Sequence, residues 1–121
     1  MNYTQGQNGS RGVGTKYENL AVKYLEDLGY TIITKNYRNK TGEIDIIAQD
    51  NNYLVFVEVK YRQSSAFGHP REAVNYSKRK NIIKVAKYYL YTHKLDVYCR
   101  FDVVEVCDDK INHLPNAFWE G

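Results

Sequence analysis

The chain has 121 residues, 43% of them hydrophobic, and carries 17 Lys and Arg against 14 Asp and Glu. This length suits one compact domain and excludes two independent cores. The formal net charge of +3 is too small for a purely electrostatic nucleic-acid binder of the histone type. The longest apolar run, Tyr53 to Val57, is far shorter than a membrane helix, and the first residues are polar, so we expect a cytoplasmic protein with no membrane partner.

The first half of the chain predicts one helix and three strands. Residues 1–12 are polar and rich in glycine, so we expect a mobile tail ahead of a single domain over residues 13–121. Apolar residues recur at helical spacing from Lys16 to Leu28, and a glycine follows where helices commonly end. β-branched and aromatic residues predict strands over 30–37, 43–48 and 53–61.

The second half predicts a loop over 62–70, a basic amphipathic helix over 77–91 and a strand over 97–107. The remaining residues, which include Pro115, are expected to pack back across the sheet. The order helix, three strands, helix, strand predicts an α/β fold in which a mixed sheet is flanked by helices.

The second and third predicted strands carry charged side chains where a core is expected. Asn51 and Asn52 suit the centre of a two-residue hairpin turn, and that turn sets a register in which Asp45 lies opposite Glu58. Carboxylates that close repel by roughly 4 kcal/mol at an effective dielectric of about 20, so a shared proton or a cation must offset the repulsion. Magnesium prefers oxygen ligands and fits between two such groups, and Lys60 lies on the same face.

A solvated strand face is the alternative reading, with Glu43 opposite Lys60 as an ordinary ion pair. Against it, the charged face also carries Ile47 and Phe56, which lie opposite each other in this register, and unpaired charge inside a core is costly. Side-chain alternation puts Glu43, Asp45 and Ile47 on one face of the second strand, and Ile44, Ile46 and Ala48 on the other.

These residues resemble a known signature. Gly42 to Asp45 followed by Val57 to Lys60 resembles the nuclease signature written PD-(D/E)xK, with Ile44 where the signature has proline. Over about residues 14–118 the chain is similar to the YraN-like family of predicted bacterial endonucleases, which are in turn similar to archaeal Holliday-junction resolvases. The supporting stretches are 21–30, 56–62, 68–74, 100–103 and 116–118.

The resemblance implies a restriction-endonuclease-like fold and a nuclease that uses Mg²⁺ or Mn²⁺ and acts on DNA. By this resemblance Asp45 and Glu58 would hold the ion, helped by the backbone carbonyl of Val59. Lys60 would orient the attacking water and stabilise the developing charge. Glu18 corresponds to an acid of the first helix in the resolvases, which makes it a third candidate ligand, and a capping or solvated glutamate is the alternative.

Positive charge is concentrated between Arg71 and Lys94, where seven Lys and Arg residues face one acid, a sum of +6. Since the whole chain carries +3, the rest sums to −3. A segregated cationic patch binds phosphates, and a solvated helix face is the alternative. The candidate nucleic-acid contacts are Lys78, which matches a family lysine, and Arg62, Arg79, Lys80 and Lys84.

Three functions stay open on the sequence: a nuclease, a nucleic-acid binding module without turnover, and a structural protein on a nuclease-like scaffold. A homodimer is also open, because resolvase-like enzymes pair to cut two strands.

The 12 tyrosines either cover partly solvated surface or supply rings for stacking on bases, with Tyr61 and Tyr76 as the candidates for stacking. Asp102 has an open role, and a pairing with Arg100 is the simplest.

Overall fold

The computed structural model describes residues 9–62, 75–108 and 110–118, with side chains from residue 16 onward. Residues 1–8 of the predicted tail and most of the predicted loop lie outside these ranges. The described elements are α1 (Gly9–Asp27), β1 (Thr31–Arg38), β2 (Glu43–Asp50), β3 (Tyr53–Tyr61), α2 (Tyr76–Thr92), β4 (Tyr98–Cys107) and β5 (Lys110–Phe118).

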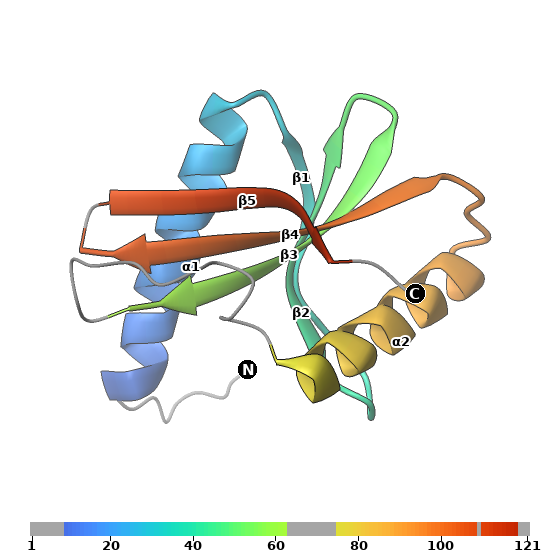
Figure 1. Cartoon of the computed structure of the whole chain (residues 1–121), viewed down its shortest axis with the longest axis horizontal. Coiled ribbons are helices and arrows are strands. Elements are labelled where there is room, and N and C mark those ends of the chain that lie inside the picture. The colour runs from blue at the N-terminus through green and yellow to red at the C-terminus, as the bar shows by residue number, and fades with distance from the viewer. Residues whose placement is uncertain (1–8, 63–74, 109, 119–121) are drawn as a thin grey trace.

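The strands form one sheet in the order β1-β2-β3-β4-β5. Neighbouring strands run antiparallel except β3 and β4, which are parallel and are joined through α2. Figure 1 shows α1 and α2 on opposite faces of this twisted sheet. The predicted α/β architecture, a mixed sheet flanked by helices, is confirmed.

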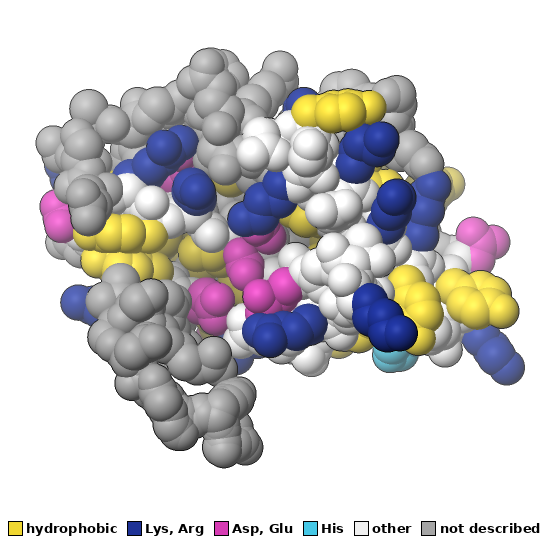
Figure 2. Space-filling model, turned by 90° about the horizontal axis from the view of Figure 1, so that it is seen from below, with side chains coloured by type: hydrophobic (Ala, Val, Ile, Leu, Met, Phe, Trp, Pro, Cys, Tyr) yellow, Lys and Arg dark blue, Asp and Glu magenta, His cyan; other side chains and the backbone are white. Residues whose placement is uncertain are grey.

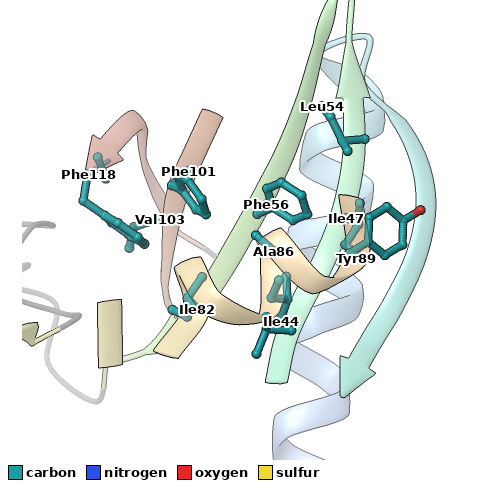
Figure 3. Close-up of a cluster of buried hydrophobic side chains, with 12 residues drawn as sticks. Ile44, Ile47, Leu54, Phe56, Ile82, Ala86, Tyr89, Phe101, Val103 and Phe118 are labelled. Atoms are coloured by element: carbon teal, nitrogen blue, oxygen red, sulfur yellow. The ribbon is translucent and has the colours of Figure 1, made fainter. Parts of the chain in front are cut away.

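Each helix covers its own layer of core, so the central strand β3 is buried on both faces. Figure 3 shows the α2-facing layer, in which aromatic rings of the sheet lie under the helix. The α1-facing layer is built from smaller side chains, and its buried residues are Ala21, Leu25, Tyr30, Ile46, Ala48, Val55, Val57, Val104 and Val106. The buried residues of the α2-facing layer are Ile44, Ile47, Leu54, Phe56, Ile82, Val85, Ala86, Tyr89, Phe101, Val103, Ala117 and Phe118.

The β2–β3 hairpin has the predicted register. Ile47 pairs with Phe56, and Asp50 pairs with Tyr53. Asn51 in the turn has a φ of 54°, a left-handed conformation that asparagine tolerates better than most residues. The sequence therefore predicts correctly which residues face each other from Ile46 to Asp50 of β2, whereas the paired ladder ends before it reaches Asp45 and Glu58.

The alternation predicted for β2 is wrong at Ile44. This residue packs in the α2-facing core with Ile47, whereas Ile46 packs in the α1-facing core. The side chains of β2 therefore depart from strict alternation between the two faces of the sheet at Asp45. On β1, Asn36 lies between the partners of Ile46 and Ile44 and has a φ of 55°. The distortion of both strands thus coincides with the position of the predicted metal ligand.

The observed bounds of the two helices differ from the predicted bounds mainly at the N-terminal end of α1. α1 begins at Gly9 rather than at Lys16, so it includes the last residues of the predicted tail, and it ends at Asp27. Gly29 follows with a φ of 102°, the left-handed conformation in which a glycine commonly terminates a helix. α2 extends one residue beyond its prediction at each end. Neither described helix is long and apolar enough to cross a membrane.

The C-terminal segment is an additional strand that the sequence does not predict. It packs against the sheet as expected, but as the edge strand β5, antiparallel to β4. Pro115 is tolerated there because an edge strand leaves one side of its backbone without ladder hydrogen bonds. Ala117 and Phe118 at its end are buried in the α2-facing core, which holds the strand in place.

Candidate functional site

Asp45 and Glu58 meet where the β2–β3 ladder ends. The last paired residues are Ile46 and Val57, and beyond them Asp45 Oδ2 accepts a 2.8 Å hydrogen bond from the Val59 backbone N–H. The Asp45 side chain thus takes the place of a backbone partner, which holds its carboxyl group beside that of Glu58.

The two acids line a pocket of about 340 Å³ formed by the start of β2, the end of β3 and the first part of α2. Figure 2 shows acidic side chains gathered in one patch of the face viewed, with Lys and Arg side chains on several sides of it. The molecule therefore presents an acidic centre with basic margins. The lining residues are Gly42, Glu43, Asp45, Glu58, Val59, Lys78, Asn81 and Ile82.

Burial and mutual repulsion disturb the ionisation of both acids. Burial, followed by the negative charge of Glu58, raises the pKa of Asp45 to about 8. Burial also raises the pKa of Glu58, although the hydrogen bond and charge of Lys78 act in the opposite direction. The raised pKa means that Asp45 holds a proton to a higher pH than an exposed aspartate does, and the protonated carboxyl then donates a hydrogen bond to Glu58. A shared proton is one of the two ways of offsetting the carboxylate repulsion that the sequence predicts, and a bound cation is the other.

The two oxygens of Glu58 have different surroundings. Oε2 lies 2.6 Å from Lys78 Nζ, whereas Oε1 is buried and has no hydrogen-bond partner among the described residues. Glu58 as a whole is only 4% exposed. A buried carboxylate oxygen without a donor is costly, so it marks a place that a proton or a cation fills.

Glu18 approaches this pair from α1. Burial, and then the charge of Asp45, raises the pKa of its carboxyl. With its amide nitrogen turned toward the acids, Asn36 donates to Glu18 Oε1 and to Glu43 Oε2, each at 3.2 Å. Over residues 9–62, 75–108 and 110–118, no three Asp, Glu, His or Cys side chains converge closely enough to hold a metal ion. Glu18 is therefore a neighbour of the pair, and not a third ligand in this conformation.

Lys60 lies on β3 two residues after Glu58, a spacing at which strand side chains share one face, but it does not line the pocket. The cross-strand ion pair of Glu43 with Lys60 does not form in the described part of the chain, because the ladder ends before it reaches these residues. Glu43 pairs instead with Arg38, at 3.3 Å. The solvated-face reading of the hairpin is wrong for Glu58, which is buried.

Arg62 is bound to a buried acid that the sequence analysis missed. Its Nε donates to Glu105 Oε2 at 2.7 Å, and Asn112 donates to the other oxygen of Glu105 at 3.4 Å. Glu105 is fully buried, while the Arg62 side chain is 31% exposed. The alternation of its strand puts Glu105 in one row with Phe101 and Val103, so a charge among core residues is the signal that identifies it.

The predicted nucleic-acid contacts on α2 fall into two groups. Lys78 points into the pocket and pairs with an acid there. Lys80 and Lys84 are exposed on the helix surface, and Arg79 is half-buried. The cations of Arg79 and Lys80 lie 5.9 Å and 5.3 Å from the ring centre of Tyr76. An exposed ring flanked by two cations is an arrangement typical of nucleic-acid contacts.

The two tyrosines predicted for stacking differ in their surroundings. Tyr61 stacks on Tyr17 of α1 with ring centres 4.1 Å apart, so one face of its ring is covered by the protein itself. Tyr76 is 65% exposed, against 38% for Tyr61. Tyr76 is therefore the better candidate for stacking on a base.

Asp102 belongs to a buried network outside the pocket. It accepts hydrogen bonds from Arg100 Nε at 3.0 Å, from the Asn116 N–H at 2.9 Å and from the Tyr30 hydroxyl at 3.3 Å. His113 Nε2 lies 2.8 Å from the same carboxylate. The pairing with Arg100 is confirmed, and these contacts connect β4 to β5 and to the start of β1.

Comparison with known proteins gives consistent matches. A family model described as "Uncharacterised protein family UPF0102" matches residues 17–106, which include both carboxylates of the pocket. A UPF0102 protein of Thermodesulfovibrio yellowstonii is 47% identical over 107 residues, covering 88% of this chain and 96% of that protein. One from Alkaliphilus oremlandii is 49% identical over 116 residues, covering 90% and 99%. One from Clostridioides difficile is 50% identical over 104 residues, covering 84% and 91%. These descriptions name no activity.

Proposed function

We propose that this chain, which belongs to the uncharacterised protein family UPF0102, is a metal-dependent nuclease that hydrolyses phosphodiester bonds. DNA is the expected substrate and the cytoplasm the expected place of action. The observation that carries the proposal is the pair Asp45 and Glu58, two acids from adjacent strands that line one pocket with basic margins.

The residues present fit a magnesium or manganese ion. Magnesium takes hard oxygen ligands and is commonly held by one or two carboxylates, with water and substrate phosphate in the other positions. Asp45 and Glu58 supply that pair, and Glu58 Oε1 is a buried oxygen without a hydrogen-bond partner in the described part of the chain. A bound cation would fill the place beside this oxygen and offset the repulsion between the two acids.

In this proposal Asp45, Glu58 and the carbonyl of Val59 hold the ion. When bound, it lowers the pKa of water and stabilises negative charge on the phosphate. Lys60, which follows on the same face of β3, orients the attacking water and stabilises the developing charge. Glu18 becomes a third ligand only after a change of its rotamer toward the pair.

The basic margins of the pocket support a polyanionic substrate. Tyr76 with Arg79 and Lys80 combines a ring for stacking with cations for phosphates at the start of α2. Arg62 lies directly after the end of β3, two residues beyond the proposed catalytic lysine, and is oriented by the buried Glu105. Substrate bound at these margins would be brought to the acidic centre between them.

The test is cleavage of labelled linear, flapped and four-way-junction DNA by the purified protein with Mg²⁺ or Mn²⁺. We expect Asp45→Asn and Lys60→Ala each to lower the rate by about 100-fold or more, as losses of charge stabilisation at an active site do. Lys23→Ala, which removes an exposed lysine on α1 outside the pocket, is the matched control and should cut like the wild type.

A non-catalytic nucleic-acid binding module is the alternative, and the pairing of Lys78 with Glu58 is the observation that favours it. It predicts salt-dependent DNA binding that survives Asp45→Asn, with no cleavage of any substrate by the wild type. That result would contradict the nuclease. A protein that neither binds nor cuts DNA would contradict both functions. A structural role on a nuclease-like scaffold would then be the remaining function. RNA versions of the same substrates separate DNA from RNA specificity.

A further inference from the structure

Lys78 has a position that its place in a basic helix does not predict. Its side chain is 47% exposed, yet the ammonium lies 2.6 Å from Oε2 of Glu58, whose side chain is only 5% exposed. Its backbone is fixed, because Asn75 caps α2 by accepting a hydrogen bond of 2.9 Å from the Lys78 N–H. The side chain therefore reaches inward from the rim of the pocket to a buried acid.

The positive charge that faces Glu58 in the pocket comes from the protein itself. The Lys78 ammonium contacts Oε2 of the buried Glu58 carboxylate, and it is the one Lys or Arg among the described residues that line the pocket. Without a metal ion, Lys78 is therefore the counter-ion that compensates a buried carboxylate.

A divalent cation changes this balance. Bound between ionised Asp45 and Glu58, it would neutralise both carboxylates, and the ammonium of Lys78 would then be a surplus positive charge beside it. The flexible four-carbon stem of lysine lets the ammonium leave while the helix stays in place. Because the Lys78 side chain is already half exposed at the pocket rim, the path outward is short.

We propose that Lys78 is a displaceable counter-ion of Glu58, which competes with a divalent cation and moves to the pocket rim when the cation binds. There the ammonium is available to a phosphate group of the substrate. This inference rests on the proposed metal site, and it assigns Lys78 a positioning role that depends on the metal.

The first test measures Mn²⁺ affinity by calorimetry in Lys78→Met and in Lys80→Met, which removes the same charge from the exposed surface of the same helix. Competition predicts that Lys78→Met binds Mn²⁺ about tenfold more tightly than wild type or better, which corresponds to about 1.4 kcal/mol. Lys80→Met should stay close to wild type. Equal affinities in the two variants, or weaker binding by Lys78→Met, would overturn the proposal.

The second test uses the wild type, so it does not depend on the folding of a variant. Amine-reactive labelling with mass spectrometry reports the accessibility of each lysine with and without Mg²⁺. We expect labelling of Lys78 to increase several-fold with Mg²⁺, while labelling of Lys80 stays unchanged. Unchanged labelling of Lys78 in protein that binds the metal would overturn the exchange.

The outcomes separate this inference from the proposed nuclease. Exchange of Lys78 without DNA cleavage would contradict only the nuclease. Cleavage with Lys78 labelling unaffected by Mg²⁺ would contradict only the exchange. If neither wild type nor Lys78→Met binds Mn²⁺, both the metal site and the exchange are wrong.

Discussion

The Asp45 carboxyl has two contacts with opposite effects: the Val59 N–H stabilises its ionised form, and Glu58 destabilises it. Burial adds to the effect of Glu58 and raises the pKa to about 8. An unfolded aspartate has a pKa of about 3.9, so between these values the folded protein holds a proton that the unfolded chain has lost. The resulting stability is complete below about pH 4 and is lost as the pH rises through about 8.

Asp45→Asn is therefore expected to stabilise the metal-free protein by about 1 kcal/mol at pH 9, with a smaller gain at pH 6. The amide removes the charge that repels Glu58 and supplies an N–H to its buried oxygen. Urea unfolding in the presence of EDTA measures the gain. Asp27→Asn, an exposed acid on α1, is the control and should change stability by less than about 0.5 kcal/mol. Destabilisation by Asp45→Asn would contradict this account of the pair.

At the scale of elements, the β2–β3 hairpin is predictable because its information is local. The two-asparagine turn sets the register, and the period of two sets the faces of β3. The side switch at Ile44 is not local. It depends on the left-handed Asn36 on the neighbouring strand and on an Asp45 side chain that replaces a backbone partner. The contact of Lys78 with Glu58 likewise depends on where α2 lies, which helical periodicity does not specify.

The strand β5 escapes prediction because its residues lack the strand pattern. Pro115, Asn112 and Asn116 interrupt the apolar residues, and Asn116 has a left-handed φ of 53°. What holds the strand is a set of long-range contacts: the Asn116 N–H and His113 both bond the buried Asp102 of β4. The sequence of β5 alone does not contain Asp102, the common partner of both contacts.

Asp102→Asn is expected to lower the free energy of unfolding by about 3 kcal/mol at pH 7, since it breaks a buried ion pair. Burial raises the pKa of Asp102, but bonds from His113, Arg100 and the Asn116 N–H outweigh it and leave the pKa below its usual value. This stabilisation is present above about pH 4 and is lost as the pH falls through the lowered pKa. The variant should therefore lose much of the acid dependence of stability measured by urea unfolding between pH 7 and pH 3.

Asp96→Asn, an exposed acid ahead of β4, is the control for Asp102→Asn and should leave both stability and its acid dependence unchanged. Hydrogen exchange adds a local measurement, because amides of β5 should lose protection in Asp102→Asn before those of the β2–β3 hairpin. Equal loss in both regions would mean that Asp102 supports the whole sheet, and not the edge strand in particular.

The first turn of α2 is expected to bind bases through Tyr76. Tyr76→Ala should weaken binding of single-stranded DNA by about 1–3 kcal/mol, the usual contribution of one stacked base. Tyr91→Ala is a matched control at the other end of the same helix, where the side chain is 81% exposed. Fluorescence anisotropy with a labelled oligonucleotide measures both. Equal effects of the two substitutions would contradict a base contact at Tyr76.

For the whole molecule, the small net charge of +3 conceals a segregated distribution. Arg71 and Glu72 of the basic segment lie outside the described residues, whereas Lys78 of α2 lines the same pocket as Asp45 and Glu58. Membership of UPF0102 confirms the family resemblance seen in the sequence, while the nuclease activity stays a prediction. For the proposed nuclease, basic margins would attract a phosphate backbone and an acidic centre would repel it, so we expect productive binding to require a cation in the pocket.

This arrangement predicts a specific salt dependence. DNA affinity should fall steeply as salt rises, because phosphate contacts release counterions, and the double variant Arg79→Ala, Lys80→Ala should lower the slope of log K against log[salt] by about two. Lys23→Ala on α1 should leave the slope unchanged, since its exposed side chain pairs with Asp27 outside the pocket. Anisotropy titrations between about 50 and 200 mM salt with Ca²⁺ present measure these slopes. If the double variant gives the same slope as the wild type, the first turn of α2 does not contact the DNA backbone, and the nucleic-acid surface lies elsewhere.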